Sequence, residues 1–461
     1  MAIRDTWTLA ERTLRTDRGN YWEEMTAAND SRKPRAIRIV PRQDGRSGWN
    51  GTDRRWQRTT VLIVVGTRPE VIKLAPVVRA LEQDATMDVK LCVVAQQTDI
   101  LDQALEEWAL VPDDRIELPQ ADRRLAAMLG AMLPRLADVI ERTRPGMVVV
   151  EGDTTTNLAA SLAAFYAGVP VAHVEAGLRS GDLSQPFPEE MHRVLVDQLA
   201  AVHYAPTLGA RQNLLDGDHR NPADVVVVGN TVVDALLATL REAAATPEPE
   251  PERQHQRQMM LVTAHRRENF GSGIAAICEA IRRLLAQRED LEVIFVLHTN
   301  PRAFRPVRQM LDGLDRVELV PPQPYRAFVR LLARADIVLT DSGGVQEEAP
   351  YLGKPVLVTR ELTERPEASQ AGAASIIGTD TQAIIEAVNS VLDDPILRST
   401  MSRRIAPYGD GHAAARIQRD LSQRLQPRER AARPADSAEI AEFEEAPERA
   451  PLTVFGSQRA S

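Results

Sequence analysis

Short apolar runs alternate with amphipathic helical patterns along most of this 461-residue chain. The first run, residues 60–66 (T-V-L-I-V-V-G), is rich in β-branched residues, and a helical pattern follows it over 69–81. Continuous apolar runs of this length are typical of strands buried on both faces, as in parallel sheets. Because the two patterns keep alternating, the sequence predicts an α/β fold built on doubly wound parallel sheets. Further strands are expected at 89–94, 147–150, 169–174, 225–228, 259–263, 292–297, 317–320, 337–340 and 356–358, and further helices at 100–108, 122–142, 155–167, 189–200, 232–242, 274–287, 302–311, 325–333, 345–351 and 381–392.

A proline-rich segment at 246–258 (T-P-E-P-E-P-E-R-Q-H-Q-R-Q) divides the alternating pattern in two. Its composition is typical of a linker, so we expect Rossmann-like domains at 59–245 and 259–405. Ligands of such folds bind at the carboxyl ends of the strands, which here would face a cleft between the domains. The two ends of the chain, 1–58 and 427–461, are poor in apolar periodicity and are predicted to be disordered.

Composition and charge exclude several classes of function. The formal net charge of −9 argues against a nucleic-acid partner, because phosphate backbones select a basic surplus. Cys92 and Cys278 lie far apart in apolar stretches, so buried and reduced thiols are expected. No apolar stretch is long enough to cross a membrane, and the N-terminus lacks a signal-peptide pattern. We therefore expect a cytoplasmic location and no membrane partner.

Two polar clusters follow predicted strands in the first half. The first reads G-T-R-P-E-V-I-K, and it places Arg68 and Lys73 near a helix N-terminus, where an anion is already favoured. The second reads E-G-D-T-T-T-N, with Asp153 just beyond a buried strand. Asp153 could also be a plain helix cap, and a residue can serve both roles.

The third cluster, residues 173–193, contains two candidate carboxylates and a candidate cation. Glu175 directly follows an apolar strand, where a charged residue needs a functional reason. Glu189 opens the next helix, where a carboxylate also stabilises the helix dipole. Arg193 closes the cluster on the same predicted helix.

The fourth cluster follows the first strand of the second half and reads T-A-H-R-R-E-N-F-G. His265 with Arg266 and Arg267 at a strand end is the pattern expected of a diphosphate contact. A lone histidine is more often structural, but two arginines and a following glycine loop favour a ligand role here.

The fifth cluster reads T-D-S-G-G-V-Q-E-E-A-P. Ser342, Gly343 and Gly344 would present backbone N–H groups at a helix start, which is the geometry of a phosphate cradle. Glu348 follows on the first turns of that helix, and Arg365 occupies a further position between a strand and a helix.

These clusters, in this order and spacing, resemble the UDP-N-acetylglucosamine 2-epimerases of the non-hydrolysing bacterial type. The resemblance covers about residues 60–424 and implies a GT-B-like fold, in which two Rossmann-like domains enclose the active site. It also implies a C-terminal helix, 406–426, that returns to the first domain, and a homodimer. The implied reaction converts UDP-N-acetylglucosamine (UDP-GlcNAc) reversibly to UDP-N-acetylmannosamine (UDP-ManNAc) by eliminating UDP, forming 2-acetamidoglucal and adding UDP back. No metal is expected, because the sequence shows neither a metal-ligand spacing of histidines and cysteines nor a carboxylate pair for a diphosphate-bound ion. No nicotinamide is implied either, because elimination and addition need no redox step.

The resemblance also assigns roles to individual residues. Asp153, Glu175 and Glu189 match the essential acidic residues of the family, and carboxylates must move a proton at C2 on each face of the sugar. His265 joins them in the catalytic set. The leaving diphosphate needs cations and N–H donors to stabilise its charge. The residues expected to bind UDP and the sugar are Arg68, Lys73, Arg193, Arg266, Arg267, Phe328 (beside the uracil), Ser342, Gly343, Gly344, Glu348 (on the ribose) and Arg365.

One short run and three single positions depart from the family pattern. A Q-Q-T run at 96–98 replaces Q-H-R in a loop that contributes to a second, activating UDP-GlcNAc site in the family. Glu151 replaces a histidine, His192 replaces an asparagine, and Thr299 replaces a proline. These changes leave open whether UDP-GlcNAc activates the enzyme and whether the substrate is a related UDP-N-acetylhexosamine. The sequence is also compatible with a hydrolysing epimerase, a GT-B glycosyltransferase or a non-catalytic nucleotide-sugar sensor.

Overall fold

The computed structural model describes residues 58–95, 98–118, 124–217, 221–245 and 257–426. The predicted disordered ends and most of the proline-rich linker lie outside these ranges, as does most of the Q-Q-T run. The helices and strands all belong to one compact unit that ends at Leu425. No helix among the described residues is both long and apolar enough to cross a membrane.

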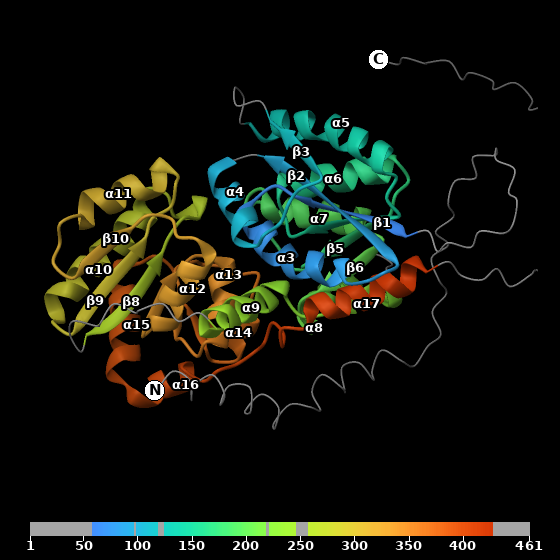
Figure 1. Cartoon of the computed structure of the whole chain (residues 1–461). Coiled ribbons are helices and arrows are strands. Elements are labelled where there is room, and N and C mark those ends of the chain that lie inside the picture. Colours follow the sequence, from blue (N-terminus) through green and yellow to red (C-terminus); the bar gives the residue numbers. More distant parts are fainter. Residues whose placement is uncertain (1–57, 96–97, 119–123, 218–220, 246–256, 427–461) are drawn as a thin grey trace, which may run out of the picture. The chain divides into compact units, whose positions relative to one another are not determined.

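The first half forms a parallel sheet with strand order β3-β2-β1-β4-β5-β6-β7 (Figure 1). Its central strand β1 is buried because every residue from Val61 to Val65 is apolar, as the sequence predicts. The strands are β1 (Thr59–Val65), β2 (Met87–Ala95), β3 (Asp114–Glu117), β4 (Met147–Glu151), β5 (Val171–Val174), β6 (Val202–Ala205) and β7 (Val225–Val227), and the helices are α3 (Arg68–Glu82), α4 (Thr98–Glu107), α5 (Leu125–Thr143), α6 (Thr155–Tyr166), α7 (Glu189–Leu199), α8 (Leu208–Asp216), η1 (Pro222–Asp224) and α9 (Thr231–Ala245).

The second half forms another parallel sheet, with strand order β10-β9-β8-β11-β12-β13. Its strands are β8 (Gln258–Thr263), β9 (Leu291–Val296), β10 (Val317–Val320), β11 (Ile337–Thr340), β12 (Val356–Val358) and β13 (Ala374–Ile376), and its helices are η2 (Arg267–Asn269), α10 (Ser272–Gln287), α11 (Pro301–Leu311), α12 (Tyr325–Arg334), α13 (Gly343–Tyr351), α14 (Glu367–Gln370), α15 (Thr381–Asp393) and α16 (Pro395–Met401). The α/β class with two doubly wound parallel sheets is therefore confirmed.

Each sheet reverses its strand order at one place, between β1 and β4 in the first sheet and between β8 and β11 in the second. Helices on opposite faces diverge at such a switch point and leave a crevice at the carboxyl ends of the two strands. The loops after these four strands carry four of the five polar clusters, so the strand order brings these clusters to the two switch points.

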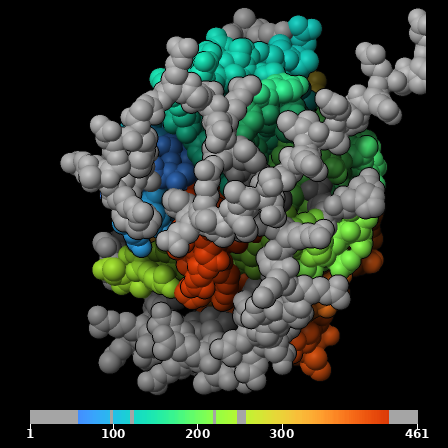
Figure 2. Space-filling view, turned by 90° about the vertical axis from the view of Figure 1, so that its right-hand side faces the viewer, coloured from blue at the N-terminus to red at the C-terminus, as the bar shows by residue number. Residues whose placement is uncertain are grey.

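The last helix, α17 (Ala413–Leu425), packs against α3 and α9 of the first half (Figure 1). The hydroxyl of Tyr204 donates to Asp420 on this helix at 2.9 Å, and Arg424 pairs with Asp224 at 3.0 Å. Figure 2 shows the red surface of α17 beside green segments that come much earlier in the chain.

Some short elements were not predicted from the sequence. Strand β3 reads D-R-I-E and contains one buried side chain, Ile116, so it lacks the apolar run of a central strand. Strand β6 (V-H-Y-A) places His203 and Tyr204 in the interior, where their polar atoms bond Asp197 and Asp420. The elements α8, β13, α14 and α16 are also additions to the predicted set.

Candidate functional site

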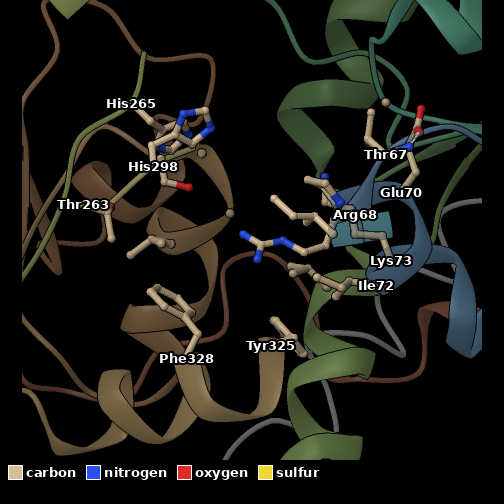
Figure 3. Close-up of a pocket in the computed structure, with 18 of the residues that line it drawn as sticks. Thr67, Arg68, Glu70, Ile72, Lys73, Thr263, His265, His298, Tyr325 and Phe328 are labelled. Atoms are coloured by element: carbon tan, nitrogen blue, oxygen red, sulfur yellow. Dashed lines mark hydrogen bonds between the residues drawn. The ribbon is translucent and has the colours of Figure 1, made fainter. Parts of the chain in front are cut away.

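A cavity of about 540 Å³ lies at the two switch points and is lined by residues from both halves (Figure 3). In Figure 3, Arg68 extends into it from α3, opposite His265 and His298, while Tyr325 and Phe328 face it from α12. Thirteen of the residues expected from the sequence line this cavity: Arg68, Lys73, Asp153, Glu175, Glu189, His265, Arg266, Phe328, Ser342, Gly343, Gly344, Glu348 and Arg365.

Two expected residues do not line the cavity. Arg193 lies behind it, fully buried, and its guanidinium pairs with Asp153 and Glu190, each at 2.7 Å. Its geometry is that of a support that fixes the Asp153 carboxylate. Arg267 is exposed at the start of η2.

On the side of the cavity formed by the first half of the chain, one lysine forms ion pairs with two carboxylates. The Lys73 ammonium lies 2.8 Å from Glu151 and 2.5 Å from Glu175, and all three side chains are buried. Burial alone would raise the pKa of Glu175, but Lys73 and Arg365 lower it to about 2, so Glu175 is ionised. Asn230 adds an N–H donor to the same carboxylate at 2.7 Å.

Glu175 has an unusual backbone. Its φ is 64°, in the left-handed region that costs a non-glycine residue roughly 1 kcal/mol or more. A strained residue that keeps a charged side chain in a cavity is typical of a functional position.

Arg365 extends the same charge network into the second half of the chain. It lies 3.2 Å from Glu175 and also pairs with Glu347 and Glu364. Burial raises the pKa of Glu347 to about 7 even though Arg365 opposes the shift. Glu364 remains ionised, because four arginines outweigh the effect of burial and lower its pKa well below the usual value.

The loop after β8 is shaped by one buried carboxylate, Asp341. It accepts the backbone N–H groups of His265 and Arg266 at 2.8 Å and the side-chain amide of Asn269 at 3.0 Å. The ring of His265 stacks on that of His298, with 5.3 Å between centroids. Burial lowers the pKa of His265, opposed in part by Asp341, so a neutral imidazole faces the cavity.

The start of α13 lines the cavity with Ser342, Gly343 and Gly344, and the Ser342 N–H donates to the Thr340 hydroxyl at 3.0 Å. A side chain at Gly343 would place its Cβ 2.6 Å from the Arg365 guanidinium, so only glycine lets the helix start lie against that cation. Glu348 on this helix accepts the Tyr325 hydroxyl at 2.6 Å, and burial raises the pKa of its carboxyl to about 7. Phe328 adds an apolar ring to the same end of the cavity (Figure 3).

Sequence reasoning missed several residues of the site. Glu70 is buried and accepts the backbone N–H groups of Gly66 and Thr67, at 2.7 and 2.6 Å. The T-x-x-E pattern of a capping box was its signal. Asn230 carried no comparable signal, because its partner Glu175 is distant in sequence. Others found only from the structure are His298, Tyr325, Glu347 and Glu364.

A crevice at two facing switch points, with buried cations, carboxylates and a glycine-opened helix start, defines an enzyme of the GT-B-like, nucleotide-sugar class. The family model described as UDP-N-acetylglucosamine 2-epimerase matches residues 79–422. The chain belongs to this epimerase family.

Individual members of the family are closely similar. The UDP-N-acetylglucosamine 2-epimerase of Escherichia coli O157:H7 is 46% identical over 368 residues, which cover 77% of this chain and 96% of the relative. The crystal structure of the Neisseria meningitidis UDP-GlcNAc 2-epimerase bound to UDP-GlcNAc is 41% identical, covers 79% of this chain and 100% of that one, and has a TM-score of 0.77. The S. aureus MnaA–UDP co-structure is 40% identical, covers 80% and 97%, and has a TM-score of 0.76.

Proposed function

We propose that this enzyme interconverts UDP-GlcNAc and UDP-ManNAc without releasing free sugar. The observation that carries the proposal is that Asp153, Glu175 and Glu189 share one cavity with Arg68, Lys73, Arg266 and Arg365. Such a site combines groups that move a proton with groups that stabilise a leaving diphosphate. The UDP-GlcNAc and UDP complexes of the two structural relatives support the choice of substrate.

The reaction proceeds by elimination and addition. One carboxylate removes the proton at C2 while the C1–O bond to UDP breaks, which leaves 2-acetamidoglucal and UDP in the cavity. A carboxylate on the opposite face returns a proton to C2, and the diphosphate oxygen re-forms the bond to C1. Two faces require two groups, and the three cavity carboxylates can supply them.

The cations and N–H donors act on the leaving group. Arg68, Lys73 and Arg365 with the Ser342–Gly344 backbone stabilise the departing diphosphate. His265 contributes as a neutral imidazole, because its pKa is lowered by burial. Phe328 contacts the uracil, and Glu348 with Tyr325 binds the ribose hydroxyls.

We also propose a cytoplasmic homodimer. The neighbouring helices α6 and α7 expose Phe165, Tyr166 and Leu195, and exposed apolar side chains of this size suit a subunit interface. We further propose that the chain is divided into two domains, at 59–245 and 259–405, joined by a linker at 246–258. A segment at 406–426 then returns to the first domain.

Proton NMR of the purified enzyme with UDP-GlcNAc alone in D₂O tests the reaction. We expect UDP-ManNAc with deuterium at C2 and no free sugar. Accumulation of N-acetylmannosamine and UDP would replace the proposal by the hydrolysing reaction. Absence of turnover would contradict it and point to another UDP-sugar or to a binding protein.

The contact between α4 and α12 gives a prediction about nucleotide affinity. Glu107 accepts the N–H groups of Tyr325 and Arg326, at 3.0 and 2.6 Å, so a residue of the first half caps the helix that bears Phe328. Its replacement by alanine removes a cap of about 1 kcal/mol, so we expect the KM for UDP-GlcNAc to rise about fivefold with little change in kcat. The neighbouring, exposed Glu106 is the matched control, and equal KM values for the two variants would contradict the role of Glu107.

A further inference from the structure

Glu151 is a buried carboxylate that the proposed reaction does not use. It ends β4, is 2% exposed and lines the cavity. Its carboxylate accepts the Lys73 ammonium at 2.8 Å, and the same ammonium donates to Glu175 at 2.5 Å. Glu151 and Glu175 therefore compete for one cation at the edge of the cavity.

The buried charge network around them is not balanced. Its members are all at most 8% exposed and are joined by ion pairs. The cations are Lys73, Arg193, Arg360 and Arg365, and the carboxylates are Glu151, Glu175, Glu190, Glu347 and Glu364. Among the residues that the structure describes, four cations of this network face five carboxylates, so full ionisation would leave one uncompensated negative charge in a dry site, which is costly.

The hydrogen bonds favour ionisation of Glu175 over that of Glu151. Glu175 receives donors from Lys73, Asn230 and Arg365, at 2.5, 2.7 and 3.2 Å. Glu151 shares Lys73 with this better-supported neighbour. Glu347 lies outside the cavity lining, whereas Glu151 lies within it, so a proton on Glu151 lies where an anionic ligand would bind.

We propose that Glu151 is a positioning residue that carries the one proton needed to balance the charges of this network. When Glu151 is protonated, the Lys73 ammonium stays paired with Glu175, and less negative charge faces a bound diphosphate. The inference rests on the proposed function only in naming a UDP-sugar as the ligand. It assigns Glu151 no contact with the reacting atoms, because it acts through Lys73.

The surroundings set the direction of the pH dependence. Burial raises the pKa of Glu151 well above its usual value, Lys73 opposes the shift, and Glu175 and Glu70 add to it. The charged and titratable groups around it are Lys73 and Glu70 on α3, Glu175 after β5, Asp153 after β4, His192 and Arg193 on α7, Glu347 on α13, and Arg365. When pH rises through the pKa of Glu151, the added negative charge disfavours an anionic ligand, so affinity falls on the alkaline side.

Calorimetric titration with UDP, which needs no turnover, tests the proposal. As pH rises from neutral through the alkaline range in which the protein stays folded, we expect the affinity of the wild-type enzyme for UDP to fall about tenfold more than that of Glu151→Gln. The titration of UDP itself is common to both proteins and cancels in the comparison. Repeating the titration in buffers of different ionisation enthalpy should show proton uptake on UDP binding at alkaline pH in the wild type, and less in the variant.

Three outcomes would overturn the proposal. Parallel pH dependences of the wild type and Glu151→Gln, or a wild type that takes up no proton, exclude Glu151 as the proton holder. Loss of the alkaline effect in Glu347→Gln instead would assign the proton to Glu347. Because the wild-type measurement requires no variant, a Glu151→Gln protein that fails to fold leaves the test intact. If the proposed epimerisation fails while proton-linked UDP binding persists, the inference survives the proposed function.

Discussion

Replacement of Glu175 by glutamine is expected to lower kcat for UDP-ManNAc formation by about 10²–10⁴-fold. Glutamine has nearly the same shape but cannot accept a proton from C2. The substitution also removes the negative charge that pairs with Lys73 and Arg365, so the activation barrier of the reaction rises for two reasons. Exchange of deuterium into C2, followed by NMR, measures the proton transfer directly.

The matched control for this change is Glu82→Gln. Glu82 is an exposed glutamate at the end of α3, and its replacement should leave kcat within about twofold of the wild type. Circular dichroism and thermal melting separate loss of chemistry from loss of fold. A Glu175→Gln enzyme that melts normally and keeps wild-type deuterium exchange would remove Glu175 from the catalytic set.

Replacement of Arg365 by methionine is expected to cost about 3–5 kcal/mol of folding free energy, besides weakening UDP binding. Arg365 is 5% exposed and pairs with Glu175, Glu347 and Glu364, so its loss leaves buried carboxylates without a cation. Protonation of Glu347 relieves that cost. Because its pKa is raised in the fold, the deficit should be smaller at acidic pH and grow as pH rises.

Urea unfolding measures this deficit against Arg282→Met as control. Arg282 is half-exposed and pairs with Glu279 on the surface of α10, so its loss should cost no more than about 0.5 kcal/mol. Adding Glu347→Gln to Arg365→Met should recover part of the lost stability. If the double variant is no more stable than Arg365→Met, the unpaired carboxylate of Glu347 is not the source of the cost.

The alternation of strands and helices could be predicted because central parallel strands must be apolar on both faces. The run 60–66 is such a strand, and the structure places β1 there with its bounds shifted by one residue. The edge strand β3 was missed because an exposed edge imposes no such composition, and D-R-I-E is as polar as a loop. Strand β6 was missed because it contains the polar side chains of His203 and Tyr204, each of which finds a hydrogen-bond partner on a helix outside the strand itself, α7 or α17.

The sequence predicts which residues line the cavity better than it predicts which of their charged side chains form ion pairs. Residues that follow parallel strands gather at one edge of a sheet, which brings Lys73, Asp153 and Glu175 together whatever their side chains do. Pairing depends on side-chain direction across the two halves, and no local pattern encodes it. Glu347 and Glu348 show the difference, because adjacent positions on α13 point one carboxylate at Arg365 and the other at Tyr325.

The return of α17 to the first half has a mechanical consequence. The chain passes between the halves twice, once between α9 and β8 and once before α17, so the second half is connected to the first at both of its ends. The second connection reaches the site through Asn230: the backbone carbonyl of Tyr408 accepts the backbone N–H of Asn230 at 2.6 Å, and Asn230 donates its side-chain amide to Glu175. A change in the relative position of the halves would therefore reach Glu175, whose backbone lies in the left-handed region, through Asn230 as well as through Arg365.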